Sequence, residues 1–137
     1  MNEGEADLGR LLRGLAPELE DRPYAFCLLP TGREEAPFFA AAIGMFREAE
    51  GVTLILPCDA ARDLGLAYDG EWARITLTIH SSLAAVGMMA AVSRALADAG
   101  ISTNPVAAYH HDHLFVQWSK RNLALMRIKE FAQGSRD

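Results

Sequence analysis

The sequence predicts an α+β fold in which helices cover one face of an antiparallel sheet. Two observations support this prediction. Residues 72–80 alternate strictly between apolar and polar side chains, and the order from Trp72 onward is strand, helix, strand, strand, helix. That order corresponds to two split βαβ units that lack one strand, a ferredoxin-like arrangement. The first half of the chain must therefore supply the missing strand.

Length, charge and composition exclude several classes of protein. A chain of 137 residues, half of them hydrophobic, can bury a core without disulfides or metals, so Cys27 and Cys58 are expected to be core side chains. The net charge is −5 and the basic residues are scattered, which argues against nucleic-acid binding. Apolar stretches end within about 12 residues, too few to span a membrane. The acidic start, residues 1–5, is unlike a signal peptide and predicts a cytoplasmic protein.

The beginning of the chain predicts a helix, a strand and a loop. Leucines at helical spacing before Pro17 predict a short amphipathic helix over Asp7–Ala16. Tyr24–Leu29 is an aromatic and branched run that ends at Pro30, as buried strands do. Residues 31–37 combine Gly, Pro and three charges, so we expect a loop there.

Residues 38–50 allow two interpretations. Their alanines, methionine and glutamates are good helix formers, so propensity alone favours a helix. A turn at Glu50–Gly51 followed by the strong strand 52–56 favours a hairpin instead, with its first strand over 41–47. We expect the hairpin and keep the helix as the alternative.

The remaining elements follow from capping residues and periodicity. Asp59 offers an N-cap for a short helix over 60–64, and Ser81 and Ser82 offer caps for a long one that Gly100 ends. The expected elements from Trp72 onward are strand 72–80, helix 83–99, strands 103–109 and 113–118, and a last helix capped by Ser119 that ends near Phe131.

The two halves of the chain are expected to form related lobes of one body. Residues 51–64 repeat the turn, strand and helix order of residues 112–128. We therefore expect an abbreviated N-terminal lobe over 1–68 and a C-terminal lobe over 69–137. The polar, Thr-rich face of strand 72–80 is not expected to be covered by a helix, which predicts a homodimer.

Several strings resemble one known family. They are Phe46–Leu54, Trp72–Leu77, His80–Leu83, Val86–Gly87, Leu96–Ser102 and Tyr109–Val116. Together they resemble the ACT-domain family and, more narrowly, small bacterial tandem ACT-like proteins of undefined role. The family includes the regulatory domains of aspartate kinases and an arginine sensor of animal cells. The resemblance implies an ACT-like ferredoxin fold over nearly all of residues 24–131.

The resemblance further implies a regulatory, non-catalytic module that binds a small molecule, usually an amino acid, where the loop after the first strand of one unit meets an edge of another. The bare amides of a helix start near Leu83 suit a carboxylate. We expect no cofactor and no catalytic residue. The predicted ligand-binding residues are His80, Ser81, Ser82, Leu83, Val86, Gly87, Asn104, Val106, His111 and Asp112.

Each of these residues also has a purely structural interpretation. The serines can serve only as caps, Gly87 can serve helix packing, and Asn104 can be a turn residue. Two rival functions stay open: a small metal-dependent enzyme that uses His80, His111 and His113, and a protein–protein assembly module. The sequence shows no phosphate-binding loop and no arrangement typical of a catalytic triad.

Overall fold

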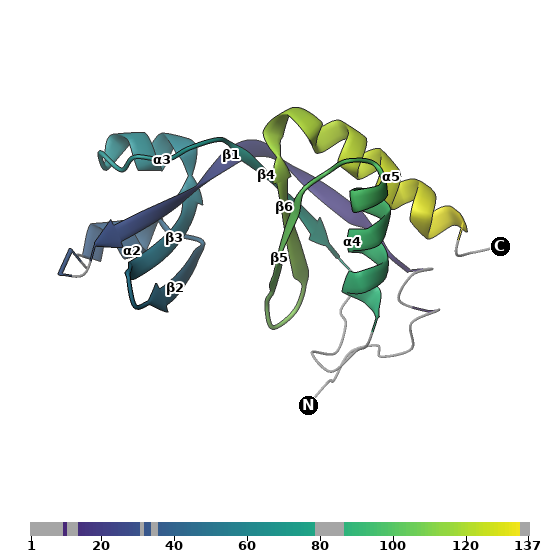
Figure 1. The fold of residues 1–137 in the computed structure, drawn as a ribbon, viewed down its shortest axis with the longest axis horizontal. Coiled ribbons are helices and arrows are strands. Elements are labelled where there is room, and N and C mark those ends of the chain that lie inside the picture. The colour runs from purple at the N-terminus through teal and green to yellow at the C-terminus, as the bar shows by residue number, and fades with distance from the viewer. Residues whose placement is uncertain (1–9, 11–13, 31, 34–35, 79–86, 135–137) are drawn as a thin grey trace. The chain divides into compact units, whose positions relative to one another are not determined.

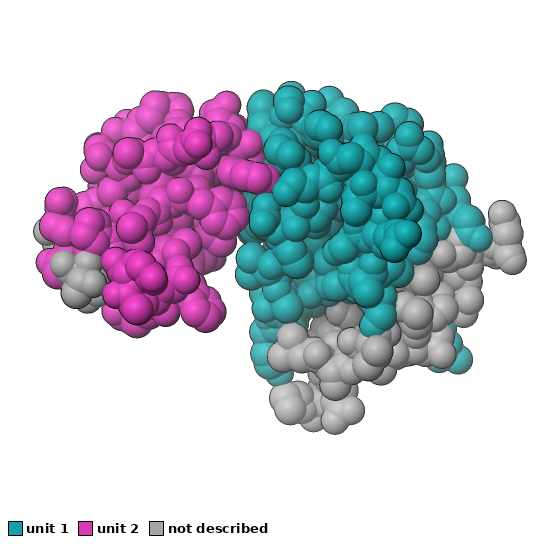
Figure 2. All heavy atoms as spheres, in the orientation of Figure 1, with its two compact units in different colours: residues 1–21, 73–137 teal, residues 22–72 magenta. Residues whose placement is uncertain are grey.

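The computed structural model describes residues 10, 14–30, 32–33, 36–78 and 87–134 (Figure 1). Contacts divide the chain into two compact units, which Figure 2 shows in different colours. Unit 1 comprises residues 1–21 and 73–137, and unit 2 comprises residues 22–72. The lobe boundary between residues 68 and 69 stays a prediction.

Unit 1 contains most of the second half of the chain. Its sheet combines the first residues of β1 with β4, β6 and β5, in that order. The elements, coloured from teal to yellow in Figure 1, are β4 (Trp72–Leu77), α4 (Met88–Asp98), β5 (Thr103–Ala107), β6 (Asp112–Gln117), the 3₁₀ turn η1 (Trp118–Lys120) and α5 (Arg121–Gly134).

Unit 2 contains the rest of β1 and a hairpin with two short helices. β3 pairs with β1 on one side and with β2 on the other, and both pairs are antiparallel. The elements are β1 (Pro17–Pro30), α2 (Ala36–Ala41), β2 (Gly44–Glu48), β3 (Gly51–Pro57) and α3 (Cys58–Asp63). Because β1 belongs to both units, the strand order is β2-β3-β1-β4-β6-β5.

In each unit, helices pack on one face of the sheet. The core of unit 1 joins the apolar face of β4 (Ala73, Ile75 and Leu77) to side chains of β6, α4 and α5. The core of unit 2 joins alternate residues of β1 and β3 to Phe38 of α2 and Ala61 of α3. The predicted α+β fold is therefore confirmed, as is the alternation of β4, whose residues Trp72, Arg74 and Thr76 are only half-buried. Cys27 and Cys58 are both buried free thiols, as expected.

The region 38–50 contains both of the structures that the sequence allowed. The hairpin exists, but its first strand begins at Gly44 instead of residue 41. A helix, α2, occupies Ala36–Ala41, where a loop and then a strand were expected. Its Phe38 is buried, so tertiary packing selected the helix that local propensity favoured. Gly51 opens β3 with a φ of 149°, and a Cβ there would collide with the carbonyl oxygen of Leu29.

Other expected boundaries were wrong by a few residues. Asp59 was expected to be the N-cap of α3, but the N-cap is Pro57. Asp59 lies inside the helix, where its side chain accepts a hydrogen bond from the Ala60 amide. The β5–β6 turn covers residues 108–111 instead of 110–112, since β5 ends at Ala107 and Asp112 already belongs to β6. Ser119 lies within the 3₁₀ turn instead of capping α5.

The expected N-terminal helix falls mostly outside the described residues. Arg10 is helical and its carbonyl accepts a hydrogen bond from Gly14. Leu15 is buried in the core of unit 1. Among the helices that the structure describes, none is both long enough and apolar enough to cross a lipid bilayer.

Candidate functional site

The start of α4 belongs to the predicted site and lies within the described residues. The helix begins at Met88, five residues later than expected, and its N-cap is Gly87 at a φ of 97°. A left-handed conformation of this kind favours glycine, because other residues meet steric strain there. No side chain forms a capping hydrogen bond at this helix start. The expected caps Ser81 and Ser82 lie outside the described residues, so their role stays a prediction.

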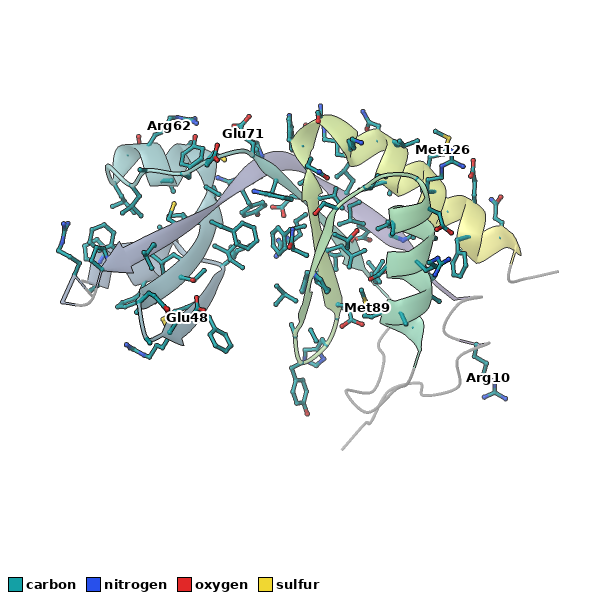
Figure 3. All side chains as sticks on the ribbon, viewed as in Figure 1. Arg10, Glu48, Arg62, Glu71, Met89 and Met126 are labelled. Carbon is teal, nitrogen blue, oxygen red and sulfur yellow. The ribbon has the colours of Figure 1, made fainter. Side chains whose placement is uncertain are left out.

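The first intrahelical hydrogen bond of α4 shows which amides are left without a helical partner. The Ala91 amide donates to the Gly87 carbonyl over 2.9 Å. The amides of Met88, Met89 and Ala90 precede that bond, and Figure 3 labels Met89 on the first turn of the helix. Amides in this position, together with the positive end of the helix dipole, suit an anionic group such as a carboxylate.

Five predicted ligand-binding residues precede Gly87 and fall outside the described residues: His80, Ser81, Ser82, Leu83 and Val86. The other five are placed. Gly87 lies at the start of α4, and the remaining four lie on the β5–β6 hairpin: Asn104, Val106, His111 and Asp112.

The β5–β6 hairpin places its candidate residues on two strands and their turn. Asn104 and Val106 are exposed on β5, opposite Phe115 and His113 of β6. The Asn104 side-chain amide donates to the Phe115 carbonyl at 3.5 Å, at the long limit of a hydrogen bond. Asp112 is buried and pairs in register with Ala107. The structure thus brings Val106 and His113 together across the hairpin.

Three buried polar atoms on or beside this hairpin have no hydrogen-bond partner among the described residues: Thr103 Oγ1, His111 Nδ1 and Gln117 Oε1. Buried polar atoms in native proteins nearly always have a partner. The His111 ring lies at the turn, 6.3 Å from the His110 ring. The hairpin therefore has unused hydrogen-bonding capacity.

The face of the unit 1 sheet that none of the described helices covers carries paired polar side chains. Arg74 donates to Glu20 at 2.8 Å, and Thr76 Oγ1 lies 3.0 Å from His113 Nδ1. Burial lowers the pKa of His113 from its ordinary value, and the positive charge of Arg74 lowers it further. At neutral pH, His113 is therefore a neutral hydrogen-bonding group.

The histidine cluster does not form a metal site within the part of the chain that is described, where no three His, Cys, Asp or Glu side chains are grouped to hold an ion. His80 lies outside that part, so the proposed set of His80, His111 and His113 stays an untested alternative.

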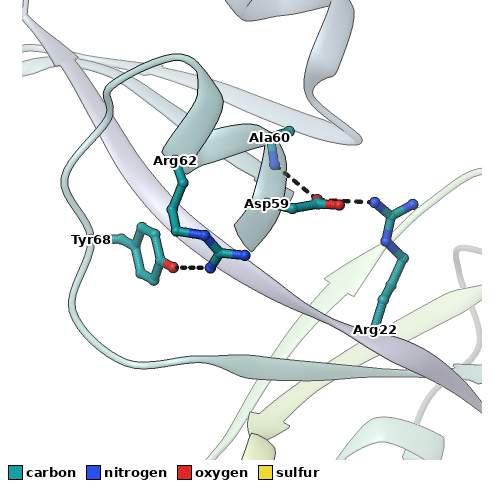
Figure 4. Close-up of polar contacts among 5 residues, drawn as sticks. All are labelled: Arg22, Asp59, Ala60, Arg62 and Tyr68. Atoms are coloured by element: carbon teal, nitrogen blue, oxygen red, sulfur yellow. Dashed lines mark hydrogen bonds and ion pairs between the residues drawn. The ribbon is translucent and has the colours of Figure 1, made fainter.

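Polar contacts in unit 2 have a structural role around α3 (Figure 4). Asp59 accepts hydrogen bonds from the Ala60 amide at 2.8 Å and from Arg22 at 3.2 Å, and these bonds lower the pKa of its carboxyl. Arg62 donates to the Tyr68 hydroxyl at 2.8 Å. These side chains hold α3 against β1 and against the segment that follows the helix, and they offer no paired acid and base.

Comparison with known families decides the classification. One ACT-domain model matches residues 3–73 and a second matches residues 71–126. The chain belongs to the ACT-domain family. The resemblance carried by strings such as Phe46–Leu54 and Tyr109–Val116 is thereby confirmed. No curated protein matches the chain.

Several solved bacterial structures have a similar fold. A Vibrio cholerae protein of unknown function is 41% identical with a TM-score of 0.81, covering 91% of this chain and 95% of that one. An Agrobacterium tumefaciens protein is 15% identical with a TM-score of 0.72, covering 86% and 89%. The regulatory subunit of Thermus thermophilus aspartate kinase is 9% identical with a TM-score of 0.61, covering 83% and 94%. The last two show a shared fold alone.

Sequence reasoning did not find the polar pairs of the uncovered face. The signal for Arg74 and Thr76 was present in the alternation of β4, which places both on the polar side of the strand. Their partners, Glu20 and His113, lie 54 and 37 residues away in sequence. No local pattern reports contacts over that separation.

Proposed function

We propose that this ACT-domain protein is a regulatory module that binds a free amino acid at the start of α4. Its membership in the family and its fold, which it shares with regulatory domains of aspartate kinases, support a regulatory ligand-binding role. The observation that carries the proposal is the helix start at Gly87, where no side chain forms a cap. The amides of Met88, Met89 and Ala90 would bind the ligand carboxylate.

The rest of the predicted site would recognise the other parts of the ligand. Asn104 offers a side-chain amide for the ligand's amino or carboxyl group, and the small residues around Val106 suit a side chain of modest size. His111 has a buried nitrogen without a partner among the described residues, and Asp112 follows it. We propose roles for His80, Ser81, Ser82, Leu83 and Val86 on the resemblance alone.

The proposal includes how the module works. It binds without catalysing a reaction, acts in the cytoplasm as a homodimer, and transmits ligand binding to a protein partner. Binding to the folded state stabilises a protein by RT ln(1 + [L]/Kd), so the ligand at a hundred times its dissociation constant adds about 2.7 kcal/mol.

A thermal-shift titration with each of the twenty amino acids tests the proposal. We expect one amino acid, or a small chemically related set, to raise the melting temperature in a concentration-dependent way. If all twenty leave the melting temperature unchanged, the amino-acid proposal is wrong. Elemental analysis of the same sample tests the metal-dependent alternative, which requires stoichiometric metal.

Gly87→Ala tests the location, with Gly32→Ala as a matched control. Both glycines have a φ near 95°, and a Cβ on Gly32 would meet nothing within 4 Å. Each substitution should cost about 1 kcal/mol of stability because alanine is strained in this conformation. We expect only Gly87→Ala to weaken binding of the stabilising amino acid, by tenfold or more. Equal binding by the two variants would place the site elsewhere.

A further inference from the structure

The last helix of unit 1 is basic, although the protein as a whole is acidic. Residues 113–129 contain four Lys or Arg side chains and no acidic one, whereas the rest of the chain has twice as many acidic as basic residues. The four are Lys120 on η1 and Arg121, Arg127 and Lys129 on α5. Basic side chains gathered on one element create a positive potential, which attracts acidic partners and speeds their association.

Two of these charges are held in place at the start of α5. Lys120 donates to the Gly100 carbonyl at 3.0 Å, and the Arg121 guanidinium lies 3.9 Å from the centre of the Trp118 ring. The first turn of α5 contains no acidic residue. Since the N-terminus of a helix is the positive end of its dipole, cations there oppose the dipole instead of complementing it. The positive potential at this end is therefore fixed and is not balanced by the helix itself.

The outward face of α5 carries the other two charges around an exposed methionine. The inward side chains, Ala124, Ile128 and Ala132, are buried in the core of unit 1. Met126 lies on the opposite side of the helix and is 50% exposed, and Figure 3 shows its side chain directed away from the sheet. Asn122 and Lys129 are exposed four residues before and three residues after it. At that spacing the three side chains form one stripe along the helix.

The positive charge of this face is only partly neutralised. Arg127 donates to Glu130 at 3.4 Å, but the two side chains are 49% and 55% exposed. An ion pair with this exposure contributes little free energy, so a partner can replace it at small cost. Lys129 forms no ion pair with any residue that the structure describes. The outward face therefore offers two cations on either side of an apolar side chain.

We propose that the outward face of α5, defined by Asn122, Met126, Arg127 and Lys129, binds an acidic segment of the protein that this module regulates. Met126 is the apolar anchor, because methionine is enriched in protein interfaces and adapts its shape to the partner. Arg127 and Lys129 pair with carboxylates of the segment. The inference rests on the proposed function, since it names the surface for the protein partner proposed there.

Composition and position favour a protein over a lipid surface or a nucleic acid. A helix that lies on a membrane needs a broad apolar face, and Met126 is the one large apolar side chain that the described part of α5 exposes. Contacts to nucleic-acid phosphates come from charged and polar groups, which leaves an exposed methionine without a role. α5 also packs against α4, so a partner on α5 lies one helix away from the proposed ligand site.

Photo-cross-linking in the native cells tests the surface. Asn122→p-benzoylphenylalanine places a photoreactive group beside Met126 without removing a charge. We expect one predominant cross-linked protein, joined through a segment rich in Asp and Glu that mass spectrometry of the cross-linked peptide identifies. Cross-linking to nucleic acid or lipid, cross-linking to a segment without excess acidic residues, or the absence of any cross-linked protein would each overturn the inference.

Charge reversal tests whether the contact is electrostatic. Lys129→Glu should lower the yield of the cross-link about tenfold, because it places like charges opposite each other, and a carboxylate-to-lysine change in the identified segment should restore the yield. Arg94→Glu is the matched control. Arg94 lies on α4 of the same unit and is 81% exposed, so this variant should cross-link as the wild type does. Circular dichroism checks that each variant is folded. An unchanged yield in Lys129→Glu, or an equal loss in Arg94→Glu, would contradict the proposed surface.

The outcomes separate this inference from the proposed function. If an amino acid stabilises the protein but the cross-link does not depend on Lys129, the ligand site stands and the α5 surface is wrong. If no amino acid stabilises the protein but an acidic segment cross-links in a charge-dependent way, the α5 surface stands and the amino-acid proposal is wrong.

Discussion

The sheet faces left uncovered by the helices that the structure describes differ between the two units. In unit 2, Leu28 and Phe46 are exposed apolar side chains. They lie on the same face of the sheet, because each is paired in register with Thr53 of the strand between them. In unit 1, the corresponding face of β4 carries Arg74, paired with Glu20, and Thr76, paired with His113. The exposed side chains of the first face are apolar, whereas the second face pairs its polar side chains with one another.

The two units differ on their uncovered sheet faces but are alike on their covered ones. Packing against helices requires apolar side chains on one side of every strand, so Ile75 in unit 1 and Leu54 in unit 2 are both fully buried. The uncovered side is under no such requirement. Its chemistry is therefore free to follow function, and differences between the units there point to different roles.

The largest expected effect separates the two faces of unit 2. Leu54→Ala should lower the free energy of unfolding by about 2–5 kcal/mol, because it opens a cavity in a closed core. Leu28→Ala should lower it by less than about 1 kcal/mol, because half of this side chain is already in water. Chemical denaturation of the two variants measures both values. Similar losses would show that Leu28 contributes to the stability of the fold as much as Leu54 does.

The uncovered face of unit 1 should give the protein a pH-dependent stability. The pKa of His113 is lowered first by burial, then by Arg74 and His111, while Asp112 and Glu20 oppose the shift. The unfolded chain, with a histidine pKa of about 6.5, therefore binds a proton at a higher pH than the folded chain. Stability should fall as the pH drops below about 6.5, until the lower folded pKa is reached.

Two variants check this pH dependence. Denaturation at a series of pH values should show a shallower loss of stability below about pH 6.5 in His113→Gln than in the wild type. NMR titration of the His113 ring should give a higher pKa in Arg74→Gln, since a repulsive charge is removed. A wild-type His113 that titrates at or above its ordinary pKa would contradict the prediction.

The smallest expected effect concerns the ion pairs. The side chains of Arg74 and Glu20 are 26% and 32% exposed and 2.8 Å apart, whereas those of Arg94 and Asp98 on α4 are 81% and 67% exposed and 3.1 Å apart. Double-mutant cycles should give a coupling of about 1 kcal/mol for the first pair and about 0.3–0.5 kcal/mol for the second. Equal couplings would show that the uncovered face of unit 1 behaves as ordinary solvated surface.

Sequence patterns predicted the elements whose structure depends on residues close together in the chain. The alternation of β4 and the hairpin at Gly51 were both predicted, because each depends on neighbours within a few residues. The start of α4 was misjudged. Ser81 and Ser82 are good caps by residue type, yet α4 begins at Met88, and its N-cap is Gly87 in a left-handed conformation without a capping side chain.

The sequence by itself determined the α+β class, the identity of the core faces and the resemblance to ACT domains, since periodicity and short strings carry that information. Only the tertiary structure decided that Phe38 belongs to a helix, that His113 meets Thr76, and that Met45 and Phe46 lie on an edge strand. The reason is physical: the order of strands in a sheet is set by contacts between residues far apart in the chain. Whether an apolar side chain is buried depends on which strand lies beside it.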